Sequence, residues 1–356
     1  MKKTFISASV ASVLALASFG ALAEGPSFYG RLDLAVTNTD SSTTLQGSTK
    51  GATIGESGTY LENNFSWLGV KGSEKVADGV DIIYQMEFGV DNTTNSGNTF
   101  NARNTFLGFK TVAGTVLAGR NDTVFKQAEG NIDAFGNTNA DMDRLVSAQA
   151  GPGRSGDGVW YYSPKIADLV TLNATYLFDD NYGTTESMYA ASATLGDKAF
   201  KEQNYYLAAA YNKAIDGVDA YRGVAQVKLG DFTVGGLFQN AESIENDSRD
   251  GNTYLVNVIY KLQNGVNLKA EYSKDEAGFG SYFKNASAGM ITGNYKTADL
   301  DDVNIDQITI GADYRLVKST LLFAHYAHYE GDFTQAGIKQ DLTEDDVVSV
   351  GVRYDF

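Results

Sequence analysis

Apolar and polar residues alternate with a period of two along nearly the whole chain. The final residues Val348 to Phe356 follow this pattern, and so does the stretch from Val80 to Val90. In that stretch every even position is apolar or aromatic: Val80, Ile82, Tyr84, Met86, Phe88 and Val90. A period of two places successive side chains on opposite faces of a β-strand. The sequence therefore predicts an all-β fold, with no convincing helical periodicity after the first residues.

A soluble β-sandwich also alternates, because one face of each sheet packs on a core. Three features favour a transmembrane antiparallel β-barrel instead. The repeat covers nearly the whole chain, the polar positions carry many full charges, and aromatic residues (21 Tyr and 19 Phe) recur near the ends of the strands. Lipid-facing apolar bands with aromatic girdles produce this pattern.

The connections between the strands alternate in length. Tight turns are expected at 112–114, 230–231, 264–265 and 317–319, whereas long polar loops are expected at 38–58, 92–100, 125–157, 179–186, 243–251, 276–304 and 332–346. Short turns at one rim and long loops at the other are typical of outer-membrane barrels. We predict sixteen strands, enough to leave an aqueous channel. They start near Phe28, Thr59, Val80, Ala102, Thr115, Gly158, Leu169, Ser187, Asn204, Tyr221, Phe232, Asn252, Val266, Ile305, Thr320 and Val347.

The first residues predict export. Lys2 and Lys3 precede an apolar stretch from Phe5 to Phe19, and small residues follow at Ala21 and Ala23. This order is typical of a secretory signal peptide, which we place at 1–23, with a barrel domain at 24–356. The alternative, a single membrane anchor, is disfavoured because a spanning helix needs about 20 apolar residues.

Composition narrows the function. The chain has no cysteine, so thiolate-ligated zinc and iron–sulfur sites are excluded, and its net charge of −16 argues against a nucleic-acid partner. The two histidines, His325 and His328, lie three apart on a predicted strand, so they face opposite sides and do not form a metal pair; we expect them near a rim. No nucleophile and base combine into a catalytic set. We therefore expect no enzyme, no metal and no cofactor.

Several short motifs, in order along the chain, resemble the Gram-negative general diffusion porins. They are Ser27-Phe28-Tyr29-Gly30-Arg31-Leu32-Asp33, Leu68-Gly69-Val70-Lys71-Gly72-Ser73-Glu74, Arg103 with Phe106-Leu107-Gly108-Phe109-Lys110, Ala118-Gly119-Arg120-Asn121, and the terminal Tyr354-Asp355-Phe356. The resemblance implies a homotrimer of sixteen-stranded barrels in the outer membrane, each narrowed by an inward-folded third extracellular loop. Its implied function is passive diffusion of small hydrophilic solutes and ions.

The resemblance also implies partners. Tyr354 and Phe356 look like the aromatic signal that the barrel-assembly machinery reads in the C-terminal strand. The exposed loops are expected to meet lipopolysaccharide and outer-membrane lipid.

The third long loop, 125–157, carries four carboxylates: Glu129, Asp133, Asp141 and Asp143. Such charges usually lie on a solvated surface, and that alternative stays open. In similar porins this loop faces a row of arginines on the barrel wall, and the matching residues here are Arg31, Arg103 and Arg120, with Arg154 at the end of the loop and Lys71 as a further candidate. Trp67 stands where such porins often carry arginine. Opposed rows of charge would create a field across the pore.

Two other functions stay open. A substrate-selective channel for sugars would need an aromatic lining, and one for phosphate would need a basic excess at the narrowest point. The polar inner faces disfavour the first, and the arginines keep the second open. An adhesin role could be added by the exposed loops of any porin.

Overall fold

A computed structural model of the chain describes residues 25–46, 52–93, 98–146, 154–182 and 184–356. The predicted signal peptide, 1–23, lies outside the described residues. The strands are β1 (Ser27–Thr39), β2 (Gly58–Asn63), β3 (Trp67–Ala77), β4 (Val80–Val90), β5 (Phe100–Thr111), β6 (Gly114–Asn121), β7 (Ser155–Tyr162), β8 (Val170–Leu177), β9 (Met188–Gly196), β10 (Tyr205–Lys213), β11 (Val218–Leu229), β12 (Phe232–Ser243), β13 (Asp250–Lys261), β14 (Val266–Asp275), β15 (Asp301–Val317), β16 (Thr320–Gln335), β17 (Ile338–Asp341) and β18 (Asp345–Asp355).

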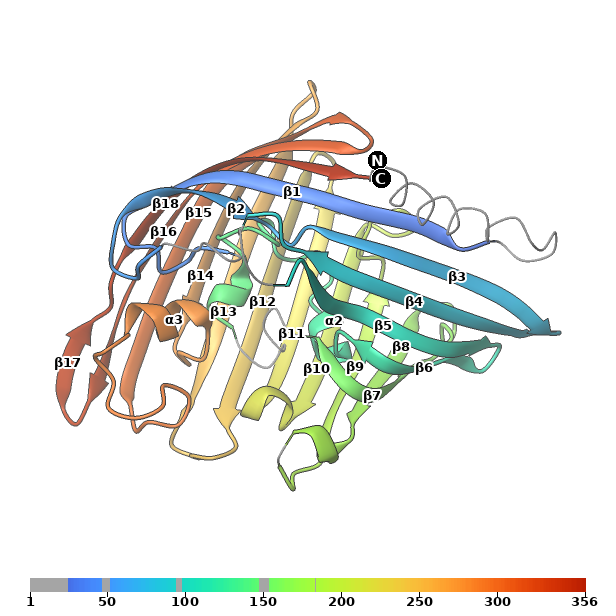
Figure 1. The fold of residues 1–356 in the computed structure, drawn as a ribbon, viewed down its shortest axis with the longest axis horizontal. Helices are drawn as coiled ribbons and strands as arrows, with labels where there is room; N and C mark the ends of the chain where they lie inside the picture. Colours follow the sequence, from blue (N-terminus) through green and yellow to red (C-terminus); the bar gives the residue numbers. More distant parts are fainter. Residues whose placement is uncertain (1–24, 47–51, 94–97, 147–153, 183) are drawn as a thin grey trace, which may run out of the picture.

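These strands form one closed antiparallel barrel (Figure 1). β1 pairs with β18, with Leu34 opposite Val352, so the sheet joins its own beginning. β2 and β3 both pair with β1 and are separated where Phe65 has a positive φ of 60°, so they form one interrupted strand of the wall. β17 pairs with the last residues of β16, beyond the part of β16 that pairs with β18. It therefore extends a hairpin and adds no strand to the wall. The wall therefore has sixteen strands, which confirms the predicted fold class.

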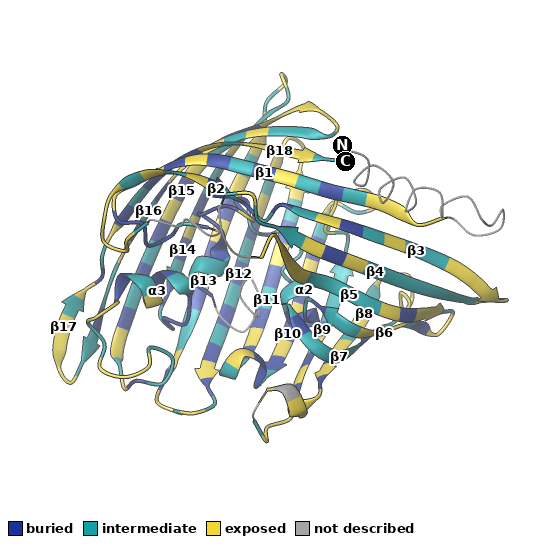
Figure 2. Cartoon of the chain, in the orientation of Figure 1, coloured by how far each residue is buried: buried dark blue, intermediate teal, exposed yellow. Residues whose placement is uncertain are grey.

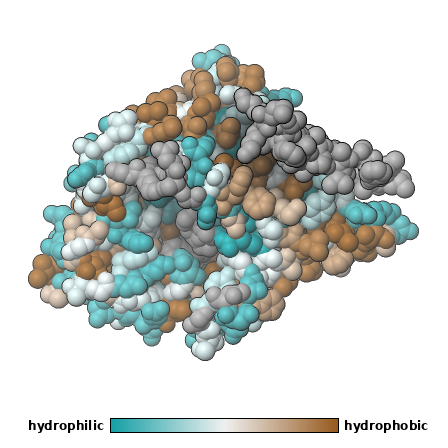
Figure 3. All heavy atoms as spheres, viewed as in Figure 1, coloured by the Kyte–Doolittle hydropathy of each residue, from teal (hydrophilic) through white to brown (hydrophobic). Residues whose placement is uncertain are grey.

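The alternation separates two faces of the barrel wall. Outward side chains are apolar and exposed: Val350 is 60% exposed and Ile310 is 55% exposed. Inward neighbours such as Ser349 and Thr309 are buried, and the resulting stripes run along the strands in Figure 2. Figure 3 shows apolar residues gathered over the strand ends to the right and polar ones around the loops at the lower left. In a membrane the outward face meets lipid, because only apolar atoms are stable there.

The helices lie in the connections. They are α2 (Val124–Gln127), α3 (Ser281–Ala286) and the 3-10 turns η2 (Met142–Arg144), η3 (Asp179–Asn181) and η4 (Ile215–Gly217). Helices this short make at most two turns, so the sequence gives them no periodic signal. In the described parts of the chain, no helix is long and apolar enough to cross a membrane.

Three of the predicted loops have wrong boundaries. The loop predicted at 276–304 ends at 300, because β15 already begins at Asp301. The third loop lies between β6 and β7, at 122–154 rather than 125–157, because Asn121 still pairs with Ser155 across an irregularity in register. Asp157, where φ is 52°, lies inside β7. The predicted loop 332–346 contains the hairpin of β16 and β17, whose polar residues continue the strand pairing past the end of β18.

Val350→Arg tests which face meets lipid. We expect it to lower the free energy of unfolding by about 2–4 kcal/mol, the usual cost of an arginine on the lipid face near the membrane centre. The measurement is urea unfolding in lipid vesicles, followed by fluorescence. Asn173→Arg is the control, since Asn173 faces a polar cavity of about 460 Å³ inside the barrel. Equal losses in both variants would contradict the assignment.

Candidate pore constriction

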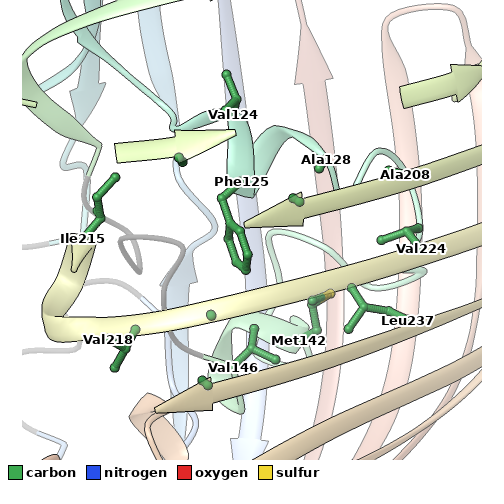
Figure 4. Packing of buried hydrophobic residues seen from close by; sticks show 14 of the residues in the cluster. Val124, Phe125, Ala128, Met142, Val146, Ala208, Ile215, Val218, Val224 and Leu237 are labelled. Atoms are coloured by element: carbon green, nitrogen blue, oxygen red, sulfur yellow. The ribbon is translucent and has the colours of Figure 1, made fainter. Parts of the chain in front are cut away.

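Residues 122–146, which follow β6, pack on the inward face of distant strands. We call Asp122 to Val146 the inner segment. It begins with α2, where the Thr123 hydroxyl accepts a hydrogen bond from the Lys126 amide (3.2 Å). Phe125 and Met142 are buried, and they belong to an apolar cluster with Ala208 of β10, Val224 of β11 and Leu237 of β12 (Figure 4). This stretch of the inner wall is apolar where the segment covers it.

Polar side chains of the wall hold the backbone of the inner segment. Each donates a hydrogen bond to one of its carbonyl oxygens. The pairs are Tyr206 to Ala128 (3.0 Å), Gln226 to Asn131 (3.1 Å), Asn257 to Ile132, Lys269 to Ala134 (2.7 Å) and Gln307 to Ala140 (2.8 Å). These donors come from β10, β11, β13, β14 and β15, so the segment follows the wall across much of the barrel. A buried carbonyl without such a partner would be costly.

Asn139 binds the inner segment to a different part of the wall, which is formed by β1, β2, β16 and β18. Its Nδ2 donates to Ser349 Oγ (2.7 Å), Glu62 Oε2 (2.6 Å) and Thr37 Oγ1 (3.1 Å). Its Oδ1 lies 2.6 Å from His325 Nε2, which therefore carries the proton. Its carbonyl accepts from the Tyr329 hydroxyl (2.9 Å). One buried amide thus joins side chains of β1, β2, β16 and β18. His325, expected near a rim, lies at this junction instead.

A cavity of about 670 Å³, the central cavity, lies between the inner segment and the wall. Six acidic and six basic residues line it among those the structure describes: Asp122, Glu129, Asp133, Asp141, Asp143 and Asp313, and Arg103, Lys126, Arg154, Lys269, Arg315 and Arg353. Five of the acids belong to the inner segment. Five of the bases lie outside it, on strands or, for Arg154, directly before β7. Apart from Lys126 and Asp313, the acids thus lie on the inner segment and the bases outside it.

The bases on the wall are held in place by carboxylates. Arg103 Nε lies 2.5 Å from Glu87 Oε1, and Arg353 Nε lies 2.5 Å from Asp33 Oδ2. Lys269 Nζ lies 2.5 Å from Asp313 Oδ2, and Arg154 Nε lies 3.6 Å from Asp122 Oδ1. These partners fix where each positive charge points without removing it from the cavity lining.

The carboxylates of the inner segment have separate roles. Asp133 accepts from the Phe135 amide (2.6 Å) and the Met142 amide (2.9 Å), and Asp141 accepts from the Asn137 amide (2.5 Å) and the Asp143 amide (2.8 Å). Both therefore shape the backbone as well as line the cavity.

Glu129 and Asp143 are bound to cations instead. Glu129 lies 3.4 Å from Arg222 Nη1, and Asp143 lies 2.6 Å from Lys126 Nζ. The Arg222 guanidinium is also 4.5 Å from the centre of the Phe125 ring, which keeps this ion pair against the apolar cluster.

Burial changes the protonation of this segment. Desolvation raises the pKa of Asp143 to about 7; Lys126 opposes the shift, and Asp141 and Glu129 add to it. Desolvation, with Glu271 and Asp141 nearby, raises the pKa of Asp133 well above its usual range. The negative charge of the segment therefore depends on pH near neutrality.

Six of the residues singled out in the sequence line the central cavity: Arg103, Arg154, Glu129, Asp133, Asp141 and Asp143. Arg31, Lys71 and Arg120 are not among its lining residues. Arg31 binds Asp355 (2.7 Å) and lies 5.7 Å from the Trp67 ring, so the aromatic at position 67 holds an arginine rather than replacing one.

Lys71 and Arg120 lie elsewhere. Lys71 Nζ is 4.7 Å from the centre of the Tyr29 ring, on the same stretch of wall as Trp67. Arg120 shares its strand parity with Val116, which is exposed outward, and its guanidinium lies beside Gly156 near the end of the barrel wall.

Sequence reasoning missed part of the lining: Asp122, Lys126, Lys269, Asp313, Arg315 and Arg353. The last four are at polar positions in strands that alternate between apolar and polar residues. The alternation predicts that their side chains face the interior, but not how deep in the barrel they lie.

A closed sixteen-stranded barrel with an apolar outer face and a charged interior defines a channel protein of the bacterial outer membrane. Residues 8–334 match the family model described as Gram-negative porin, and the chain belongs to this family. It forms a channel for passive diffusion across the outer membrane and is not an enzyme.

Relatives agree with this assignment. The chain is 26% identical over 307 residues to the major outer membrane protein P.IB of Neisseria lactamica, covering 85% of this chain and 86% of that one. Its fold resembles the anion-selective porin from Comamonas acidovorans, with a TM-score of 0.68, 18% identity, and coverage of 93% and 99% of the two chains. It also resembles the trimer form of OmpT from Vibrio cholerae, with a TM-score of 0.63, 18% identity and the same coverage.

Asn139→Ala tests how firmly the inner segment is held. Loss of the amide leaves His325 Nε2 without its buried acceptor and removes one of the three hydrogen bonds that Glu62 accepts, so we expect a loss of about 1–3 kcal/mol in the free energy of unfolding and greater noise in single-channel current. Asn173→Ala is the control, because Asn173 Nδ2 donates only to Ser192 among the hydrogen bonds of the described residues. Equal current noise in both variants would contradict this role.

Proposed function

We propose that the central cavity is the constriction of the diffusion channel. The observation that supports it is the sorting of charge, with acids on the inner segment and bases on the wall. Small hydrophilic solutes and ions pass between the two rows, and the inward-folded segment sets the size limit. Facing rows of opposite charge in a low-dielectric wall create a transverse field, which orders water and hinders apolar solutes.

Equal numbers of acidic and basic residues favour weak ion selectivity. A sugar-selective channel is disfavoured, because Phe65, Phe135 and Phe323 are the only aromatic residues among the described residues that line the central cavity. The Comamonas porin is named anion-selective, but a strong anion preference here would need an excess of bases that this lining lacks.

We also infer a homotrimer with the apolar outer faces as contact surfaces. A trimer form is known for OmpT, which shares this fold. Residues 1–23 are proposed as the signal peptide that directs export. Tyr354 and Phe356 are exposed at the end of the last strand, with ring centres 6.1 Å apart, and are proposed as the contact for the barrel-assembly machinery. The acidic outer loops are proposed to meet lipopolysaccharide.

Arginine substitutions test the constriction. Arg103→Ala or Arg154→Ala removes a base from the lining, so the potassium-to-chloride permeability ratio should rise roughly two- to fivefold at low salt, where screening is weak. The measurement is the reversal potential in a planar bilayer under a salt gradient. Arg120→Ala is the matched control, and it should leave the ratio unchanged because Arg120 does not line the cavity.

Single-channel recording of the wild-type protein tests the diffusion function and the trimer. Large ohmic steps in groups of three are expected from a trimer of diffusion pores. Unchanged permeability ratios in both arginine variants would overturn the placement of the constriction. Folded protein that forms no channels would contradict the diffusion function and favour an adhesin role.

A pH titration tests the inner segment. Lowering the pH from 8 to 6 protonates Asp143, whose pKa is raised to about 7 mainly by burial, and the lining becomes less negative. Selectivity should therefore move toward anions. Asp143→Asn should show a smaller change, whereas Asp341→Asn, exposed on β17, should respond like the wild type. Identical titration curves for wild type and Asp143→Asn would contradict the assignment.

A further inference from the structure

A further cavity, which we call the outer chamber, lies on the loop side of the central cavity and has a volume of about 360 Å³. Its walls come from the end of the inner segment and from the connection between β14 and β15, residues 276–300. The two cavities share Phe65, Asp141 and Asp143 as lining residues, so they adjoin each other. The chamber is therefore next to the proposed constriction.

The chamber is built by close packing of two loops. Gly280 lies so near the carbonyls of Arg144 and Leu145 that any side chain there would collide with them. Tyr282 is fully buried and donates to the Thr343 carbonyl (3.0 Å), and Asn285 donates to the Thr43 carbonyl (2.8 Å). These contacts hold α3 in place over the inner segment.

Two cations face this chamber without a carboxylate partner. Arg144 Nη1 donates to Ser281 Oγ (3.2 Å), and no carboxylate of the described residues lies within 4.0 Å of the Arg144 or Lys284 nitrogens. Ser281 and Lys284 are three residues apart in α3, so they share one face of the helix. Lys284 Nζ lies 5.9 Å from the centre of the Tyr295 ring. Arg144, Ser281 and Lys284 all line the chamber.

The acids of the chamber are already engaged. Asp143 is bound by Lys126 (2.6 Å), and Asp216 is bound by Lys296 (3.1 Å). Asp141 accepts two backbone amides at 2.5 and 2.8 Å. The formal charges of the lining cancel, and three charged groups have no ion-pair partner among the described residues: Arg144 and Lys284, and Asp141, whose carboxylate is held by backbone amides.

We propose that the outer chamber is a transient binding site for small phosphate monoesters, which gather there before they cross the constriction. This inference rests on the proposed diffusion route through the central cavity. A phosphate monoester carries close to two negative charges at neutral pH, which the two unpaired cations can balance, whereas the Asp141 carboxylate is held by two backbone amides. Guanidinium groups bind phosphate oxygens in pairs, the Ser281 hydroxyl adds a donor, and the volume suits a sugar phosphate.

The test is block of potassium chloride current by glucose 6-phosphate, added on the loop side of trimers in a planar bilayer. Wild-type current should fall in a saturable way, whereas glucose should have no effect. Arg144→Gln and Lys284→Gln should each raise the dissociation constant about fivefold, which corresponds to about 1 kcal/mol. Lys339→Gln removes an equal charge from exposed β17 outside the chamber and should leave the constant unchanged.

Equal block by glucose, or unchanged dissociation constants in both chamber variants, would overturn the proposal. Lys284 is exposed on α3, so its variant should fold even if Arg144→Gln does not. If channels that conduct normally are not blocked, the binding site in the chamber is contradicted, but the diffusion function is not. A failure of the diffusion route would appear separately, as unchanged permeability ratios in the Arg103 and Arg154 variants.

Discussion

The hydrogen bonds between β1 and β18 are the constraint on which the rest of the structure depends. Hydrocarbon offers no partner to a free backbone amide or carbonyl, so a spanning sheet is stable only when it has no edge. Pairing from Arg31–Asp355 to Thr39–Val347 removes both edges at once, and the Gly30 and Phe356 backbones exchange two bonds of 3.0 Å at the rim. Closure also creates the enclosed interior that the inner segment occupies.

Inside that closed wall, a second layer of structure is held by groups that the wall supplies. The apolar cluster around Phe125 holds one part of the inner segment and the Asn139 junction holds another, with side-chain donors to carbonyls between them. Because both parts are fixed, the carboxylates between them keep a defined position relative to Arg103 and Arg353. The charge pattern of the central cavity is thus a product of packing as much as of composition.

The sequence predicted the outer face and the strand number because lipid imposes one simple rule on every outward position. It predicted less of the interior, where no single solvent sets the pattern. Val224 and Leu237 face inward yet are apolar, since the inner segment covers them. The alternation placed Arg353 on the polar face of its strand but did not show that it lies at the depth of the central cavity. Asp133 accepts hydrogen bonds from two backbone amides, which only the folded segment shows.

The Asn139 junction has a consequence for the order of folding. Its partners His325 and Ser349 are 186 and 210 residues away along the chain, and Thr37 is 102 residues away in the other direction. Because the junction joins side chains of β1, β2, β16 and β18, it is complete only when these strands already lie together. The full set of Asn139 contacts therefore forms with or after the closure of the wall by β1 and β18.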